Sequence, residues 1–216
     1  MGFVEYLTSP GTIDALVEQG IAHIILTGAA VITATVLGVA LGIVAHRVLW
    51  LRGPIMNLLS VFLTIPSIAF IALLIPFLGI GFKPVYVPLT LYALLPIARN
   101  TLAGLTGVDP AVVESARGMG LSNQQRLWRM EMPVAWPVIL TGIRVATLLI
   151  VGIAAIAALV GGDGLGEEIY LRGIRRIGSP GALDALLGGT LGVLVIAALF
   201  DLFYQVIGRF TISKGL

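Results

Sequence analysis

A run of 29 residues, from Pro54 to Phe82, contains no charged side chain. A helix needs about 20 apolar residues to cross a bilayer, where unpaired backbone N–H and C=O groups are too costly for open structures. The whole chain shares this character, because 58% of its 216 residues are hydrophobic and only 11% are charged. The sequence therefore predicts an all-α, polytopic membrane protein and excludes an ordinary water-soluble domain.

We expect about five transmembrane helices, because the chain holds five apolar segments of sufficient length. Pro66 and Pro76 lie within the second segment, so we expect that helix to be kinked and then to end. The five segments form one transmembrane domain over residues 21–208. They cover residues 21–45, 54–82, 84–108, 133–160 and 182–208.

The first 20 residues are acidic and lack the basic start of a signal peptide. Apolar residues such as Phe3 and Leu7 predict a short helix on the membrane surface, with a break at Thr8, Pro10 and Gly11. We therefore interpret residues 1–20 as a segment that precedes the first span on the outer side.

The basic residues of the short loops predict the orientation, because Lys and Arg accumulate in cytoplasmic loops. An external N-terminus places eight basic residues in the cytoplasm and four outside. We therefore expect a bacterial inner-membrane protein with its N-terminus outside and residues 209–216 as a cytoplasmic tail. The eight are Arg47, Arg52, Arg99, Arg117, Arg126, Arg129, Arg209 and Lys214, and the four are Lys83, Arg172, Arg175 and Arg176.

No group of residues points to catalysis or to a metal. The chain has no cysteine, which excludes disulfides, thiolate metal sites and cysteine nucleophiles. His23 and His46 are expected at span ends as interface residues, and two separate histidines make no metal site. The net charge of +2 fits loops that face anionic lipid and gives no sign of nucleic-acid binding. We expect no enzyme activity and no cofactor bound by this chain.

Two connections, residues 107–132 and 161–181, are too long to be simple turns, and functional residues concentrate in such loops. In the first, Asp109 precedes a proline and predicts the start of a short helix that ends at the glycines near residue 120. Ser122 and Gln125 have the spacing of a capping box and predict a second short helix that leads into the fourth span.

The second helix of this loop should be amphipathic. Leu121, Leu127 and Met130 give it an apolar side. Three basic residues lie around that side, and a module of this kind can dock in a groove of another protein. They are Arg117, Arg126 and Arg129.

The spacing of residues in this loop resembles the EAA loop of ABC importer permeases. That pattern is E-A-A, three residues, G, nine residues, I-x-L-P, and this chain has Ser115 for the second alanine and methionines at positions 130 and 132. The resemblance implies a type I ABC importer permease fold and a loop that inserts into a cytoplasmic ATPase, which binds ATP and Mg²⁺. The coupling residues it implies are Glu114, Ser115, Ala116, Arg117, Gly120, Leu121, Met130 and Pro133.

A wider resemblance covers residues 21–208. Segments such as Thr64-Ile65-Pro66-Ser67 and Leu94-Leu95-Pro96-Ile97-Ala98-Arg99-Asn100-Thr101 are similar to the osmoprotectant permeases. The resemblance implies import of a small zwitterion such as glycine betaine or carnitine, or of choline, with ergothioneine or an amino acid as alternatives.

The external loop also resembles that branch, which implies a contact with a substrate-binding protein. A solvated connection is the alternative for this loop. The contact residues would be Gly164, Leu165, Glu167 and Glu168.

Arg144 and Asp201 are the charges placed deepest in the expected spans. An ionisable group in a span usually faces a partner or a water-filled cavity. Both lie at similar depth in the cytoplasmic half, so we predict an ion pair between the fourth and fifth spans, with a substrate contact as the alternative.

Several neutral polar residues near the kinked helices are candidates for a translocation path. Hydrogen bonding between helices is the alternative, and it is common for Ser, Thr and Asn in membranes. The candidates are Asn57, Thr64, Ser67, Asn100 and Thr101.

The main alternative to an ATP-driven permease is a self-sufficient channel or secondary transporter. The chain has no Gly-x-x-x-x-Gly-Lys-Ser/Thr sequence, so any ATP is hydrolysed on a separate subunit. It also shows no inverted repeat of the kind that many secondary transporters carry. Five spans enclose a path poorly, which favours a dimer with a second copy or a paralogue, embedded in lipid.

Overall fold

The structure is a computed structural model that describes residues 2–212, and within them it is helical without strands. The tail residues 213–216, with Lys214, lie outside the described residues. The long elements are α2 (Pro10–Arg47), α3 (Leu49–Thr64), α4 (Ser67–Leu78), α5 (Phe82–Thr106), α8 (Met132–Ile156) and α9 (Ala182–Thr211). The short elements are α1 (Phe3–Thr8), α6 (Pro110–Gly118), α7 (Asn123–Arg126), the π-turn Leu127–Glu131, and the turns Ala157–Val160, Glu168–Gly173 and Ile174–Arg176.

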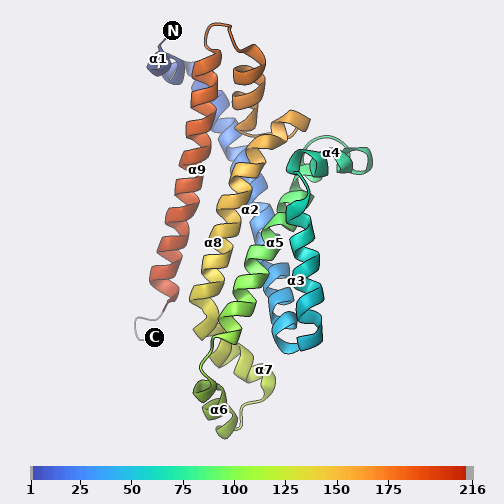
Figure 1. Cartoon of the computed structure of the whole chain (residues 1–216). Coiled ribbons are helices and arrows are strands. Elements are labelled where there is room, and N and C mark those ends of the chain that lie inside the picture. The colour runs from blue at the N-terminus through green and yellow to red at the C-terminus, as the bar shows by residue number, and fades with distance from the viewer. Residues whose placement is uncertain (1, 213–216) are drawn as a thin grey trace.

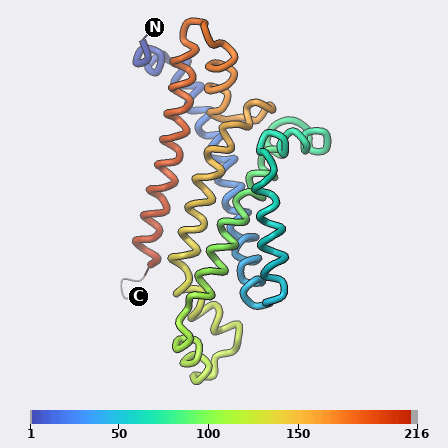
Figure 2. The backbone as a smooth tube through the Cα atoms, in the orientation of Figure 1, coloured from blue at the N-terminus to red at the C-terminus, as the bar shows by residue number. Residues whose placement is uncertain are grey.

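The long helices form an elongated bundle in which α2, α5 and α9 run one way and α3 and α8 run the other (Figure 1). The start of α1 lies at one end of the bundle, whereas α6, α7 and the end of α9 lie toward the other (Figure 2). The N- and C-terminal ends of the described chain therefore lie toward opposite ends, as an odd number of passes requires.

The core lies where α5 packs between α2 and α8, and glycines let the helices approach closely. A Cβ atom added to Gly42 of α2 would lie 2.5 Å from Thr101 Cβ, and one added to Gly142 of α8 would lie 2.5 Å from Asn100 Cβ. In lipid, no hydrophobic effect drives helices together, so membrane helices associate through van der Waals packing. Small residues at the contacts allow this close packing.

By length and composition, three of the described helices can each cross a membrane, namely α2, the continuous stretch Asn123–Val160, and α9. The bent pair α3 and α4 makes a fourth if it counts as one span. Helix α5 lies where the sequence predicts the third span, is 25 residues long and occupies the core, but it is not among the helices that length and composition identify as possible spans.

The second expected span is not a single kinked helix. It is two helices, α3 and α4, bent by 94°. Pro66 disfavours helical geometry at the preceding residue, and Ile65 is extended, with φ −75° and ψ 126°. The first of these helices, α3, begins at Leu49, before the expected start of the second span at residue 54.

The first span also begins earlier than expected. Helix α2 starts at Pro10, where a proline is tolerated at the first helical position, and Gly11 lies inside the helix. Only α1 remains as a separate short helix, and its break from α2 falls at Ser9, next to the predicted position.

Candidate functional site

The first helix of the 107–132 loop, α6, is closed at both ends by its own sequence. The Asp109 carboxylate accepts a 2.8 Å hydrogen bond from Ala111 N, as the N-cap prediction requires. At the other end Gly120 has φ +78°, its N–H donates to Arg117 O, and Leu121 N–H donates to Ala116 O. These two bonds form a Schellman motif, so the sharp turn after α6 depends on a glycine at position 120.

The second helix, α7, starts with the predicted capping box. Gln125 N donates to the Ser122 hydroxyl at 3.3 Å, and Ser122 N donates to Gln125 Oε1 at 2.9 Å. The helix then continues without a break through the π-turn Leu127–Glu131 into α8. The loop is thus joined rigidly to a long helix of the bundle.

The loop presents a mixed surface at its tip. Glu114, Ser115, Arg117 and Gly120 are exposed, whereas Ala116 is fully buried. Pro133 is exposed at the start of α8, and Leu121 and Met130 are half-buried.

The apolar part of that surface differs from the prediction. Leu127 is buried in the core of this chain, so it is not free to dock elsewhere. Met119 and Trp128 are the large apolar side chains that the loop exposes, by 66% and 55%. Neither residue was predicted, because the periodicity of the second helix and the spacing of the EAA pattern do not include them.

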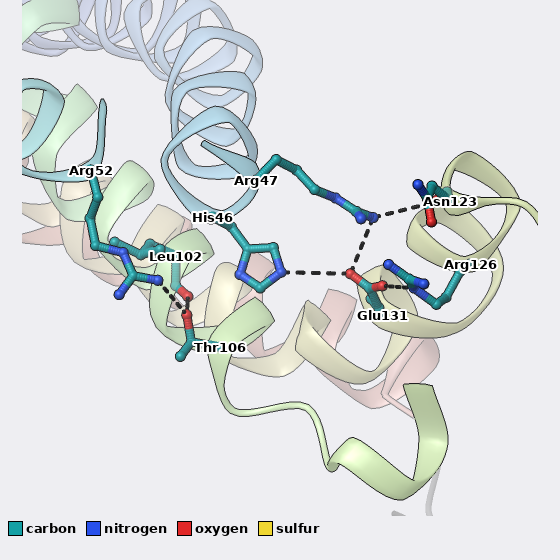
Figure 3. A network of polar contacts seen from close by, with 8 residues as sticks. All are labelled: His46, Arg47, Arg52, Leu102, Thr106, Asn123, Arg126 and Glu131. Atoms are coloured by element: carbon teal, nitrogen blue, oxygen red, sulfur yellow. Dashed lines mark hydrogen bonds and ion pairs between the residues drawn. The ribbon is translucent and has the colours of Figure 1, made fainter. Parts of the chain in front are cut away.

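A buried carboxylate ties the loop to the end of α2. Glu131 is 3% exposed and accepts a 2.6 Å hydrogen bond from Arg126 Nε, which belongs to a side chain that is also buried. Arg47 Nη2 lies 3.4 Å and His46 Nε2 lies 3.8 Å from the same carboxylate (Figure 3). Arg47 also donates to the backbone carbonyl of Asn123 at 3.2 Å.

The π-turn explains how this network forms. Arg126 and Glu131 are five residues apart, and hydrogen bonding from i to i+5 stacks such residues on one side, whereas an α-helix stacks residues four apart. Removing one member of a buried ion pair costs about 3–5 kcal/mol, because the other charge is left uncompensated. Glu131 was not predicted as a functional residue, although it is the only acidic residue between Arg117 and Pro133 in the sequence.

Arg144 and Asp201 come together between α8 and α9. Arg144 Nε lies 2.5 Å from Asp201 Oδ1, and Gln205 Nε2 donates to Asp201 Oδ2 at 2.7 Å. The two side chains of the pair are 42% and 26% exposed in the single chain, so they are less enclosed than expected. Arg144 borders a hollow of about 540 Å³ that Thr141, Gln205 and Arg209 also line.

The candidates for a translocation path do not gather around one opening. Thr101 is fully buried against Gly42 and donates to the carbonyl of Ile97 in its own helix, and Asn100 donates to Pro96 in the same way. Thr101 is buried and Asn100 is half-buried between packed helices, and their assignment to a path stays a prediction.

The other three path candidates lie apart from that core pair. Asn57 and Thr64 are exposed on α3, and Ser67 begins α4. The Thr64 hydroxyl donates to Val61 O in its own helix.

The opposite end of the bundle is more enclosed than the sequence suggests. Glu168 is fully buried, accepts a hydrogen bond from the Tyr6 hydroxyl and pairs with Arg172 at 3.2 Å. Burial and the Glu168 carboxylate raise the pKa of Tyr6 to about 12, so its hydroxyl remains a donor. Gly164 and Leu165 are also buried, so these two residues and Glu168 are not the surface contacts that we expected.

Two further residues at this end have clear positions. Glu167 is the partly exposed member of the expected contact set. His23 is fully buried, with Nε2 3.1 Å from Val151 O, and its expected place at the membrane interface is wrong. A glycine at position 164 accepts φ +131° and allows the chain to pass next to this histidine.

A protein-family model described as "binding-protein-dependent transport system inner membrane component" matches residues 34–213. The chain belongs to this family. It is therefore a membrane-embedded permease component of an ABC importer, in agreement with the resemblance of its 107–132 loop and with its apolar helices.

Named relatives cover almost the whole chain. The permease is 34% identical over 213 residues to the choline transport system permease protein OpuBB of Bacillus subtilis, which covers 99% of this chain and 95% of that protein. It is 40% identical over 200 residues to the osmoprotectant import permease protein OsmW of Salmonella typhimurium, with 90% and 89% covered. It is 37% identical over 186 residues to the carnitine transport permease protein OpuCB of Listeria monocytogenes, with 86% and 83% covered.

Solved structures show the same fold. A chain of the MetNI methionine ABC transporter, in an inward-facing crystal form, superposes with a TM-score of 0.83 at 22% sequence identity, with 94% of this permease and 99% of that chain covered. The fold of this permease is therefore that of an ABC importer permease.

Proposed function

We propose that this permease imports a small osmoprotectant that carries a quaternary ammonium group, such as choline, glycine betaine or carnitine, using ATP hydrolysed by a separate subunit. The observation that carries the proposal is the loop of residues 107–132, a two-helix module that exposes Glu114 and Gly120 at its tip and continues into α8. The names of three relatives, which transport choline, carnitine and osmoprotectants, support the substrate class.

The proposed contact with the ATPase uses the exposed tip of this loop. Met119 and Trp128 supply apolar area, and Glu114 and Arg117 supply charges of opposite sign around it. Interfaces combine apolar anchors with a polar rim in this way. ATP and Mg²⁺ bind to the partner in this proposal, and this chain supplies no residue to them.

The proposed functional unit holds two permease chains. Thr141 and Gln205 are exposed and Arg144 is half-buried on the face between α8 and α9, within helices apolar enough to cross a membrane. Polar and charged groups are costly against lipid, so a second permease chain or a water-filled path should cover this face. The second chain is a further copy or a paralogue.

The remaining proposals concern the membrane and the second partner. The permease lies in the bacterial inner membrane with the 107–132 loop in the cytoplasm, which puts Glu167 and the 161–181 connection outside. A substrate-binding protein delivers the ligand there. We no longer assign its contact to Gly164, Leu165 or Glu168, because these residues are buried.

Uptake by the complete transporter tests the proposal. We expect that membranes with this permease, its ATPase and its binding protein accumulate radiolabelled choline, glycine betaine or carnitine only when ATP is supplied. A permease variant with Glu114→Lys should insert normally but lose both co-purification of the ATPase and uptake, because the reversed charge opposes docking. Wild-type uptake in this variant, or ATP-independent uptake by the permease alone, contradicts the proposal.

A further inference from the structure

Two parts of the permease meet at the Glu131 carboxylate although they are far apart in the sequence. Arg126 and Glu131 belong to the stretch that joins the 107–132 loop to α8, whereas His46 and Arg47 form the last turn of α2. The carboxylate is 3% exposed, so water cannot screen it as it screens a surface ion pair. Figure 3 shows the side chains of His46 and Arg47 approaching it from α2 and that of Arg126 approaching from the loop.

The network gives the loop a second connection to the bundle. The first connection is covalent, since α7 continues through the π-turn into α8. The second is ionic, since Arg47 reaches both Glu131 and the carbonyl of Asn123 at the start of α7. Helix α2 packs along α5 in the core and also contacts α8 and α9, so a displacement passed to the end of α2 reaches the other long helices of the bundle.

We propose that Glu131 is a positioning residue for energy coupling, which holds the end of α2 to the loop so that the loop moves α2 together with α8. The proposal rests on the proposed function, because it needs the loop to receive motion from an ATPase. Without the carboxylate, the guanidinium groups of Arg47 and Arg126 would face each other uncompensated at this junction and separate, and the loop would then move α8 alone.

Arg47→Gln is the informative variant. Arg47 is partly exposed, and its removal leaves the buried pair of Arg126 and Glu131 intact, so the loop and α8 should fold normally. Arg52→Gln is the matched control, because Arg52 is also a basic residue close to the end of α2. Its guanidinium group lies 3.5 Å from the Thr106 hydroxyl and does not contact Glu131 among the described residues. Glu131→Gln and the conservative Glu131→Asp complete the series.

The experiment measures ATP hydrolysis and choline uptake in proteoliposomes that contain the complete transporter with its binding protein. We expect Arg47→Gln and Glu131→Gln to retain bound ATPase and to hydrolyse ATP, but to transport several-fold less choline per ATP than the wild type. Arg52→Gln should match the wild type, and Glu131→Asp should recover part of the ratio. A role in folding alone would lower the yield of transporter without changing this ratio.

A distance measurement tests the same idea directly, because the chain has no cysteine. Spin labels at Val48→Cys and Gln124→Cys should report one narrow distance distribution through the ATP cycle in the wild-type background and a broader one with Arg47→Gln. An unchanged transport ratio and an unchanged distribution in Arg47→Gln would overturn the proposal. A wild-type transporter that shows no ATP-driven uptake would instead overturn the proposed function.

Discussion

Arg144 and Asp201 are 57 positions apart in the sequence, and their side chains meet between α8 and α9. Each charge alone in a membrane helix would need another partner or would be left uncompensated. Asp201 also accepts from Gln205, so both of its oxygens are engaged. The pair therefore fits a structural role that joins the two helices.

A double-mutant cycle tests that role. We expect Arg144→Leu and Asp201→Leu each to lower the thermal stability of the purified transporter, and the double variant to lose less than the sum of the two, because it leaves no lone charge. Additive losses would mean that the two residues do not stabilise each other. Uptake that collapses in each single variant at unchanged stability would instead place the pair on the substrate path.

Gly120 offers a second test at a single residue. Its φ of +78° costs other residues about 1–2 kcal/mol, because their Cβ atoms crowd the backbone in the left-handed region. We expect Gly120→Val to loosen the turn after α6, so that the ATPase co-purifies weakly and uptake falls at least tenfold. Gly118→Ala is the control, since its backbone is helical and a Cβ there would meet no atom within 4 Å apart from its chain neighbours and the nearby backbone of its own helix. Equal uptake in both variants would show that the turn is not needed.

Which residues could be predicted from the sequence depended on how local their partners are. The caps at Asp109 and Ser122 use neighbours two or three positions away, so the spacing alone was sufficient. Thr101 packs against α2, and Glu168 bonds to Tyr6 of α1. These partners lie far away in the sequence, so no local pattern predicts the contacts. The same reason explains why Glu131 was missed.

At the scale of elements, the bend between α3 and α4 is held by a residue of another helix. Pro66 prevents regular helical hydrogen bonding there, and the carbonyl of Ile65 is satisfied by the Tyr92 hydroxyl of α5 at 2.9 Å. Phe70 packs edge-on against Tyr92, with ring centroids 5.9 Å apart. The prolines in the sequence predicted an interruption, but its 94° angle depends on this packing.

We therefore expect Tyr92→Phe to destabilise the permease by about 0.5–1.5 kcal/mol, because it removes the donor to a partly buried carbonyl while it keeps the ring. Thermal unfolding of the purified transporter in detergent measures the loss. Tyr170→Phe is the control, since the Tyr170 hydroxyl makes no hydrogen bond within residues 2–212. A Tyr92→Phe variant as stable as this control would show that the bend does not need the hydroxyl.

The lengths of the elements were less predictable than their number. Apolar composition locates the centre of a span but not the ends of its helix. Helix α2 begins 11 residues before the apolar segment at 21–45, because Asp14 and Glu18 are helical as well. No local sequence pattern predicts the π-turn before α8. In the structure, this turn brings Arg126 and Glu131 into contact.

At the scale of the whole molecule, α1 and the end of α9 lie toward opposite ends of the bundle. The permease can therefore take one of two orientations in the membrane, with the N-terminus outside or inside. The basic residues divide eight to four in favour of an external N-terminus. The 107–132 loop carries Arg117, Arg126 and Arg129, and Arg47 and Arg52 lie at the same end of the bundle, where they contact Asn123 and Thr106. The charge rule and the proposed ATPase contact therefore demand the same orientation. Single cysteines can test it, because the chain has none.

We expect a cysteine at the exposed position 5 to react with a membrane-impermeant maleimide in intact cells or spheroplasts, and a cysteine at the exposed position 210 to react only after permeabilisation. Glu5→Cys and Phe210→Cys should both retain uptake, since neither residue packs in the core. Labelling in the reverse order would put the 107–132 loop outside the cell, away from any cytoplasmic ATPase. That result would overturn the orientation and the proposed coupling together, because a loop outside the cell cannot receive motion from ATP hydrolysis.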